Sequence, residues 1–333
     1  MTSRERYLAM IRREPVDIVP RVPILMQFAA EYIGSNYGAF ASDHRILVEA
    51  NIRCAEDFGF DQVSVISDPY RETQGFGAEI VYVKDGVPRC PKPPLGDSRN
   101  LALLKDPDPL VSERMRDRVD AVRLFRERTG DMYSILGWVE GPAAEAADLR
   151  GVSTFLVDLL DDDDFCCQLM DRCLDTGIAF AKAQLEAGAD TIGVGDAIAS
   201  QMSPDMYERF VLPREQVLVD SIHSMGGLVR LHICGNITHL LLGIATLGID
   251  VLDVDHMVDM ADARRILGNA VTLAGNIDPA AGMRYGSPES IRENIRETYK
   301  TVGNPHLVTA GCEIPSGTPN ENLSALCEPI SGM

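Results

Sequence analysis

The chain has 333 residues, with 31 Lys and Arg against 50 Asp and Glu, so its formal net charge is −19. Hydrophobic residues make up 45% and charged residues 24%, which is the composition of an ordinary water-soluble globular protein. A chain of this length buries a large core without needing disulfides or a structural metal ion. The excess of acid argues against nucleic acid and against an anionic membrane surface as partners, because both repel a negatively charged protein.

The N-terminal residues and the hydropathy pattern predict a cytoplasmic protein. Residues 1–13 contain several charged side chains and lack the apolar segment that signal peptides carry. No stretch of about eighteen apolar residues occurs, so we expect no transmembrane helix.

Short β-branched apolar segments alternate with longer amphipathic segments along the chain. The apolar segments are short and nearly continuous in hydrophobicity, which is typical of strands buried on both faces of a parallel sheet. We predict eight strands: Arg21–Phe28, Gln62–Asp68, Met132–Val139, Thr191–Asp196, Leu228–Cys234, Val251–Asp255, Val271–Asn276 and His306–Cys312.

Three of the intervening segments carry signals of helix ends. Asp43–Phe58 starts with a capping Asp and stops before a glycine, whereas Ser203–Met225 and Ser287–Val302 both open with Ser-Pro and are followed by glycine. Eight strands alternating with helices predict an α/β protein with a (β/α)8 TIM barrel, in a single domain spanning residues 1–333. The alternative is an open doubly wound sheet, but no G-x-G-x-x-G follows any predicted strand.

Residues 78–90 interrupt the alternation between the second and third predicted strands. Ala78–Val83 and Val87–Cys90 flank the sequence Lys-Asp-Gly, a pattern that predicts a β-hairpin with an Asp-Gly turn. We expect this hairpin to be an insertion at the C-terminal mouth of the barrel, where insertions commonly shape a site.

Polar residues at the C-terminal ends of the predicted strands are the candidates for a functional site, because that end of a (β/α)8 barrel holds the active site. Apart from the possible metal ligands, the candidates that we predict to line a pocket are Asp68, Asp196, Asp255 and Asn276. Asp196 has an alternative role, which is to turn the chain after its strand.

His232 and Cys234 end the fifth predicted strand and give the sharpest local signal. Residues two apart in a strand point to the same side, so the imidazole and the thiol face one space. Cys312 ends the eighth predicted strand and reaches the same rim. Two thiolates and an imidazole form a good ligand set for zinc, and three protein ligands with one exchangeable position are typical of a catalytic zinc site.

Glu140 lies just past the third predicted strand, between the only tryptophan of the chain and a Gly-Pro turn. It is a candidate for the fourth zinc ligand. It is equally a candidate for capping the helix that starts near Pro142. The residue pattern alone does not separate these two roles.

Six segments spread over nearly the whole chain resemble one known superfamily. They are Arg4–Leu8, Pro15–Asp17, Met202–Tyr207, Leu231–Gly235, Ala274–Pro279 and Gly311–Pro319. They are similar to the uroporphyrinogen decarboxylase superfamily and, within it, to the zinc- and corrinoid-dependent methyltransferases. This resemblance implies that zinc binds to His232, Cys234 and Cys312. Gly137–Arg150 most closely resembles the O-demethylating members, in which the matching Glu binds zinc, and this implies a ligand role for Glu140.

The chain also departs from the true decarboxylases of this superfamily. Those enzymes hold a tetra-acid porphyrinogen with an Arg-rich segment after the first strand, whereas Met26–Glu31 contains no arginine. Asp68 matches the essential Asp of the decarboxylases. Binding several carboxylates without the arginines would leave buried charges unpaired, so we expect no decarboxylation.

The resemblance implies a zinc-dependent enzyme that moves a methyl group from a small methylated substrate, such as a methoxylated aromatic compound, to a Co(I) corrinoid. We expect this corrinoid on a separate protein, because the chain has no D-x-H-x-x-G corrinoid-binding signature. The predicted pocket residues would then face the substrate or the corrinoid. One alternative is the transfer of a methyl group from a methylcorrinoid to a thiol, such as coenzyme M, or to a folate. A second alternative is a non-catalytic zinc-binding barrel.

Overall fold

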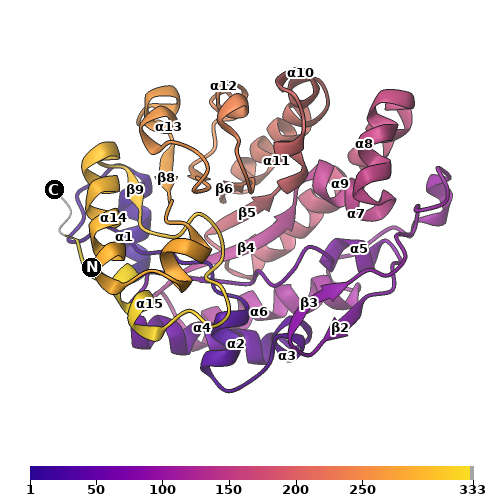
Figure 1. Ribbon diagram of the computed structural model, residues 1–333. Helices are drawn as coiled ribbons and strands as arrows, with labels where there is room; N and C mark the ends of the chain where they lie inside the picture. Colours follow the sequence, from indigo (N-terminus) through magenta and orange to yellow (C-terminus); the bar gives the residue numbers. More distant parts are fainter. Residues whose placement is uncertain (331–333) are drawn as a thin grey trace.

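The centre of the fold is a curled parallel β-sheet surrounded by helices (Figure 1). The computed structural model describes residues 1–330, and within them seven parallel strands are hydrogen-bonded in the order β1-β4-β5-β6-β7-β8-β9. They are β1 (Gln62–Ser64), β4 (Ser134–Glu140), β5 (Thr191–Gly195), β6 (Leu228–His232), β7 (Val251–Asp253), β8 (Thr272–Ala274) and β9 (His306–Leu307). β4 and β5 are buried along their whole length, as expected for strands covered on both faces.

The predicted first strand, Arg21–Phe28, is wrong as a strand, and an irregular segment takes its place. The Val22 N–H donates to the Val308 carbonyl at 2.9 Å, and the Asp61 N–H donates to the Arg21 carbonyl at 2.7 Å. The segment therefore joins the end of β9 to the start of β1. Pro23 has no N–H to donate, which interrupts a regular ladder here. The predicted α/β barrel class is confirmed, with seven regular strands in the parallel sheet of the described residues where eight were predicted.

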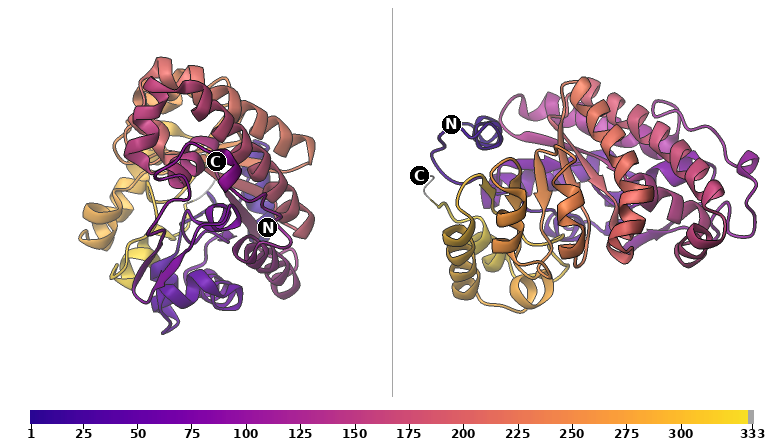
Figure 2. Two further views of the ribbon diagram at one scale, coloured as in Figure 1. Left: turned by 90° about the vertical axis from the view of Figure 1, so that its right-hand side faces the viewer. Right: turned by 90° about the horizontal axis from the view of Figure 1, so that it is seen from above.

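The helices follow one another around the sheet, as two rotated views show (Figure 2). They are α1 (Ser3–Ile11), α2 (Gln27–Tyr32), α3 (Tyr37–Ser42), α4 (His44–Phe58), α5 (Arg71–Gly75), α6 (Glu113–Thr129), α7 (Pro142–Arg150), α8 (Val152–Asp161), α9 (Asp163–Ala187), α10 (Pro204–Met206), α11 (Leu212–Ser224), α12 (Leu241–Ile244), α13 (Met260–Leu267), α14 (Pro288–Val302) and α15 (Asn320–Leu326). Within residues 1–330, none of these helices has the length and apolar character needed to cross a bilayer.

The three predicted helices are confirmed, one of them with an irregularity. The Asp43 side chain caps α4, which ends at Gly59 in the left-handed conformation, and the Ser287 side chain caps α14. The segment predicted as Ser203–Met225 is divided into α10, a π-helical turn at Tyr207–Val211 and α11. Pro213 lies in the first turn of α11 and cannot donate to the preceding turn, which accounts for the irregular hydrogen bonding there.

The predicted hairpin is confirmed as β2 (Val81–Val83) paired antiparallel with β3 (Gly86–Arg89), inserted between β1 and β4. It packs on α3, where the Gly38 N–H donates to the Lys84 carbonyl at 3.0 Å. A Cβ at Gly38 would lie only 2.7 Å from the Val83 carbonyl oxygen, so this close approach requires glycine. The Tyr82 ring lies 5.2 Å from the guanidinium carbon of Arg114 and so covers a buried charge of the barrel.

We predict that His306 of β9 makes the stability of the fold depend on pH. Burial lowers the pKa of this imidazole to about 4, whereas an unfolded histidine titrates near 6.5. Between these values the unfolded chain binds the extra proton, so stability falls as the pH decreases through this window, by about 3 kcal/mol in total. Denaturant unfolding at a series of pH values should show this loss in the wild type. The variant His306→Asn keeps a side-chain N–H for the Leu273 carbonyl and should lack this part of the loss. Parallel pH profiles for the two proteins would contradict the assignment.

Candidate metal centre

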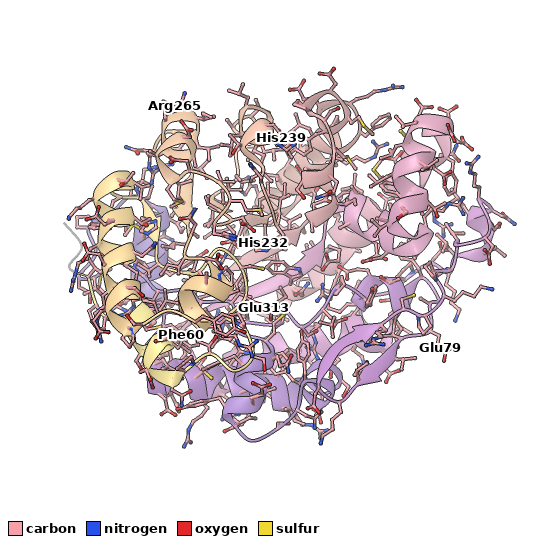
Figure 3. The ribbon with its side chains drawn as sticks, in the orientation of Figure 1. Phe60, Glu79, His232, His239, Arg265 and Glu313 are labelled. Atoms are coloured by element: carbon pink, nitrogen blue, oxygen red, sulfur yellow. The ribbon has the colours of Figure 1, made fainter. Side chains whose placement is uncertain are left out.

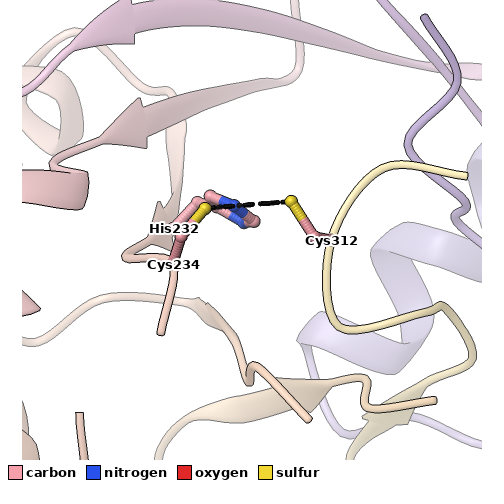
Figure 4. A group of neighbouring side chains, drawn as sticks. All are labelled: His232, Cys234 and Cys312. Atoms are coloured by element: carbon pink, nitrogen blue, oxygen red, sulfur yellow. Dashed lines mark hydrogen bonds between the residues drawn. The ribbon is translucent and has the colours of Figure 1, made fainter. Parts of the chain in front are cut away.

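Three side chains from two distant parts of the chain meet at the C-terminal end of the barrel: His232 and Cys234 from one, and Cys312 from the other (Figure 4). Cys234 Sγ lies 3.0 Å from His232 Nε2 and 3.8 Å from Cys312 Sγ. Cys312 Sγ lies 3.8 Å from His232 Nε2. The imidazole is buried and the two thiols are half-buried. The structure thus brings together the three residues that the sequence singled out as metal ligands.

The donor set and its spacing fit a zinc ion. In a tetrahedral site with Zn–S bonds of about 2.3 Å and Zn–N bonds of about 2.0 Å, two sulfur atoms lie roughly 3.8 Å apart, and sulfur and nitrogen roughly 3.5 Å apart. The observed Sγ–Sγ distance of 3.8 Å agrees with the expected sulfur–sulfur distance. Of the two Sγ–Nε2 distances, 3.0 Å is shorter and 3.8 Å is longer than the expected sulfur–nitrogen distance. Thiolate and imidazole are ligands that favour zinc over magnesium or calcium. Three protein ligands leave a position for an exchangeable ligand.

The contacts within the cluster shift the pKa values of the two cysteines in opposite directions. Hydrogen bonding from Cys234 and from His232 lowers the pKa of Cys312 to about 4, although burial opposes this shift. The same contact with Cys312 raises the pKa of the Cys234 thiol, which therefore keeps its proton. Burial opposes protonation of His232, but the contacts with Cys234 and Asp253 prevail and raise its pKa well above the ordinary value. Because metals bind thiolates and neutral imidazole, a cation would displace the protons of both Cys234 and His232.

Two glycines allow the chain to present the two cysteines to each other. Gly235 has a φ of +96°, in the region that favours glycine, and turns the chain immediately after Cys234. A Cβ at Gly311 would lie 2.6 Å from the backbone nitrogen of His256. Glycine at this position lets the segment that carries Cys312 pack directly on the loop after β7.

A buried carboxylate orients the imidazole of the cluster. β6 and β7 are in register at His232 and Asp253, and Asp253 Oδ2 lies 3.0 Å from His232 Nδ1. Arg230, two residues before His232, donates from Nε to Asp253 Oδ1 at 2.8 Å. Burial alone would raise the pKa of Asp253, but the charge of Arg230 outweighs it and the pKa lies below its ordinary value. A carboxylate at Nδ1 fixes the tautomer that leaves Nε2 free for a metal.

Glu140, predicted as the fourth ligand or as a helix cap, ends β4 and is not one of the three clustered groups. Its Oε1 accepts hydrogen bonds from Arg71 Nη2 at 2.5 Å and from Trp138 Nε1 at 3.2 Å. Burial raises the pKa of Glu140 well above its ordinary range, although Arg71 opposes this. Gly195 of β5 lies in register between Glu140 and His232. Because Gly195 has no side chain, Trp138 and Glu140 occupy the space above it.

The cluster opens into a small cavity of about 170 Å³. Its wall is mainly apolar and includes Ile24, Met26, Ile66, Pro69 and Trp138. Among the described residues, the charged groups in this wall other than the cluster itself are the carboxylates of Asp68, Glu140 and Glu313, and no Lys or Arg lines it. The cavity therefore suits a small, largely apolar molecule next to the metal ligands.

Asp68 lines the cavity, but its charge is already paired. Arg114 donates from Nη1 to Oδ1 at 2.7 Å and from Nη2 to Oδ2 at 2.6 Å, and Ser67 Oγ donates to Oδ2 at 2.7 Å. Burial would raise the pKa of Asp68, but the ion pair with Arg114 prevails, and the pKa lies well below the ordinary value. The carboxylate is thus an ionised structural group with both oxygens occupied.

The other three predicted pocket residues hold backbone segments, and the described part of the cavity wall does not include them. Asp196 accepts the Ala144 N–H at 2.8 Å and so caps α7, the role considered for Glu140; burial raises its pKa to about 7. Asp255 Oδ2 accepts the Gly235 N–H at 2.9 Å and supports the turn after Cys234. Asn276 Nδ2 donates to the carbonyls of Asp255 at 3.1 Å and Val258 at 2.8 Å.

Three residues of the site were missed in the sequence reasoning: Asp253, Trp138 and Glu313. A signal existed for Asp253, since an acid inside a buried strand needs a partner and Arg230 is the nearest basic residue in the preceding strand. A signal also existed for Trp138, because it shares a strand face with Glu140. Glu313 follows a candidate ligand in a loop, where residue spacing does not determine the direction of a side chain.

Comparison with known proteins identifies relatives along the whole chain. Residues 2–332 match the family model described as uroporphyrinogen decarboxylase (URO-D). The methylcobamide:CoM methyltransferase MtbA of Methanosarcina mazei is 31% identical over 98% of this chain and 97% of its own length. A uroporphyrinogen decarboxylase of Microcystis aeruginosa is 28% identical over 97% of this chain and 96% of its own length. A solved structure of a methyltransferase from Methanosarcina mazei matches with a TM-score of 0.90 and 27% identity, covering 98% of this chain and 97% of that one.

We predict that the purified protein contains about one zinc ion per chain, held by the three clustered ligands. Cys234→Ala and Cys312→Ala should each lose this zinc, because two remaining ligands do not retain the metal. Cys167→Ala removes a half-buried thiol outside the cluster and should keep it. Elemental analysis of the four proteins after dialysis provides the measurement. Retention of zinc by both cluster variants would exclude a shared site.

We predict that Asp253→Asn weakens zinc binding by about 10- to 100-fold, because it removes the carboxylate charge that orients His232. Competition with a chromogenic chelator measures the dissociation constant. Asp205→Asn, on the exposed surface of α10, is the matched control and should bind zinc as the wild type does. Equal zinc affinity in both variants would show that the contact between Asp253 and His232 does not affect metal binding.

Proposed function

The chain belongs to the uroporphyrinogen decarboxylase family, in its corrinoid-dependent methyltransferase branch, and we propose that it moves a methyl group from a methylcorrinoid carried by a separate protein to a small thiol. The observation that carries this proposal is the His-Cys-Cys cluster at the base of a small apolar cavity. A soft ligand set with an exchangeable position suits the activation of a thiol.

The same cavity argues against decarboxylation of a porphyrinogen. A tetra-acid substrate needs several cationic partners, and no Lys or Arg lines the described cavity wall. Asp68, which matches the essential acid of the decarboxylases, has both carboxylate oxygens bound by Arg114. It has no free oxygen with which to polarise a pyrrole N–H.

The relatives favour a thiol acceptor over the methoxylated donor that the sequence segment Gly137–Arg150 suggested. The relative that is 31% identical along nearly its whole length is a methylcobamide:CoM methyltransferase. Methyl transfer to a thiol was the alternative in the sequence interpretation, and we now prefer it to O-demethylation. Zinc is our proposed cofactor, and a corrinoid-carrying protein is the proposed partner.

Zinc bound at the cluster would act as a Lewis acid that lowers the pKa of the acceptor thiol. The chain's own residues hold this centre in place: Asp253 orients His232, and Asp255 supports the turn after Cys234. Trp138 and the aliphatic wall exclude water from the acceptor sulfur. In the transfer, the acceptor sulfur forms a bond to the methyl carbon and the carbon–cobalt bond breaks. The electron pair of the broken carbon–cobalt bond stays on cobalt, and the proton of the acceptor thiol leaves to solvent.

Glu140 stays our candidate for the fourth ligand, in exchange with the acceptor thiol. It lines the same cavity, and its Oε1 is held by Arg71 and Trp138. Away from the metal, Glu140 would keep its bond to Arg71, so no isolated buried charge would be exposed.

We predict that the zinc-loaded protein methylates at least one of coenzyme M, mercaptoethanol and cysteamine, with free methylcobalamin as donor. The absorbance change of methylcobalamin and mass spectrometry of the thioether measure the transfer. Cys312→Ala should lower the rate by about 100-fold or more, because the Lewis acid contributes several kcal/mol. Cys167→Ala should retain activity.

Other results would support the alternative functions. Methylation of a Co(I) corrinoid by a methoxylated aromatic compound, with no thiol methylated, would favour O-demethylation. Inactivity in both directions despite bound zinc would favour a non-catalytic zinc protein.

A further inference from the structure

Glu313 is the residue of the cavity that the proposed reaction leaves without a role. It follows Cys312 and lines the same cavity as His232, and Figure 3 labels both residues near the middle of the view. Its Oε2 is buried and has no hydrogen-bond partner among the described residues. Carboxylate oxygens of Glu72, Glu145 and Glu215 also lack a partner among the described residues, but of these four side chains only Glu313 lines the cavity, where a ligand can supply the missing donor.

The two arginines near the cavity each bind a carboxylate, although Nε and Nη1 of Arg71 have no hydrogen-bond partner among the described residues. Arg114 is bound by both oxygens of Asp68, and Arg71 binds Glu140 and lies 3.6 Å from Glu72. Neither arginine is part of the described cavity wall. An anionic group on a ligand would therefore meet the acidic side chains of the described cavity wall, in which no Lys or Arg takes part, and desolvating it there would be costly.

We propose that the acceptor thiol carries an amine or another cationic hydrogen-bond donor, which Glu313 binds while the sulfur lies at the metal cluster. This inference rests on the proposed thiol methyltransferase function and specifies its substrate class. An aminothiol matches the cavity in both chemistry and size, since it combines a soft sulfur with a donor for the Glu313 carboxylate. An acceptor with a sulfonate or carboxylate group, such as coenzyme M, does not.

Three thiols of equal chain length test this preference: cysteamine with an ammonium group, mercaptoethanol with a hydroxyl group, and coenzyme M with a sulfonate group. The values of kcat/KM for each are measured with methylcobalamin in the wild type, in Glu313→Gln and in Glu321→Gln. Glu321 is exposed on α15 and serves as the matched control. Intrinsic differences in thiol reactivity cancel when the ratio of two acceptors is compared between proteins.

In the wild type, we expect cysteamine to be the best of the three acceptors. In Glu313→Gln, the ratio of cysteamine to coenzyme M should fall by about 10-fold or more, the size of one charge-assisted hydrogen bond. The rate with the neutral mercaptoethanol should change by less than about 3-fold, and the zinc content should not change. Glu321→Gln should keep the wild-type ratio.

Several results would overturn this inference. If the wild type prefers coenzyme M, a cation must bind the sulfonate group in the cavity, and Arg71 would be the candidate. An equal loss with all three thiols in Glu313→Gln, together with loss of zinc, would show that Glu313 only supports the cluster. Calorimetric binding of cysteamine and coenzyme M to the zinc-loaded wild type separates this inference from the proposed function. If no thiol is methylated, the proposed function is wrong. If cysteamine binds no more tightly than coenzyme M, the proposed preference for a cationic thiol is wrong.

Discussion

The buried carboxylate of Asp253 is the group on which the candidate site depends. It is ionised inside the barrel because Arg230 pairs with it, and it uses its second oxygen to hold the imidazole of His232. Arg230 in turn donates from Nη1 to Gln62 Oε1 at 2.7 Å, so that one polar chain links β1, β6 and β7 across the barrel interior. Removing one member would leave a buried charge without its partner. Fold stability and the orientation of the metal ligand are therefore coupled.

A second constraint comes from two glycines of β5, which leave room for Trp138 in the apolar wall of the cavity. A Cβ at Gly193 would lie 2.2 Å from Trp138 Cε3, and one at Gly195 would lie 3.1 Å from Trp138 Cζ2. The indole therefore lies across β5 only because two inward positions of that strand have no side chain. Its ring centroid lies 5.9 Å from that of His232, close enough to shield the cluster from water. The same absence of side chains on β5 keeps Glu140 within reach of the cavity.

The sequence was sufficient for those features that depend on chain periodicity. Alternating apolar and amphipathic segments predicted the α/β barrel, and the spacing of His232 and Cys234 predicted two side chains on one face. The parts that failed depend on contacts between distant segments. Arg21–Phe28 has the hydropathy of a strand, but Pro23 cannot donate a backbone hydrogen bond. The segment therefore joins β9 to β1 through a few backbone hydrogen bonds and forms no regular ladder. Asp196 ends a strand like a pocket residue, yet the nearby N-terminus of α7 attracts its carboxylate. No local pattern contains the position of α7.

The charged groups around one cavity bear on whether a barrel of this family suits decarboxylation or methyl transfer. This chain retains the acid at position 68 but places Arg114 on both of its oxygens, and the Tyr82 ring of the hairpin covers that guanidinium. An acid that is neutralised and covered in this way contributes to stability and has little capacity for proton chemistry. The same cavity is also lined by two cysteines and a histidine, which supply a soft ligand set. Under the proposed function, a barrel of this family serves a different reaction because different side chains at its strand ends have partners and different ones are left free.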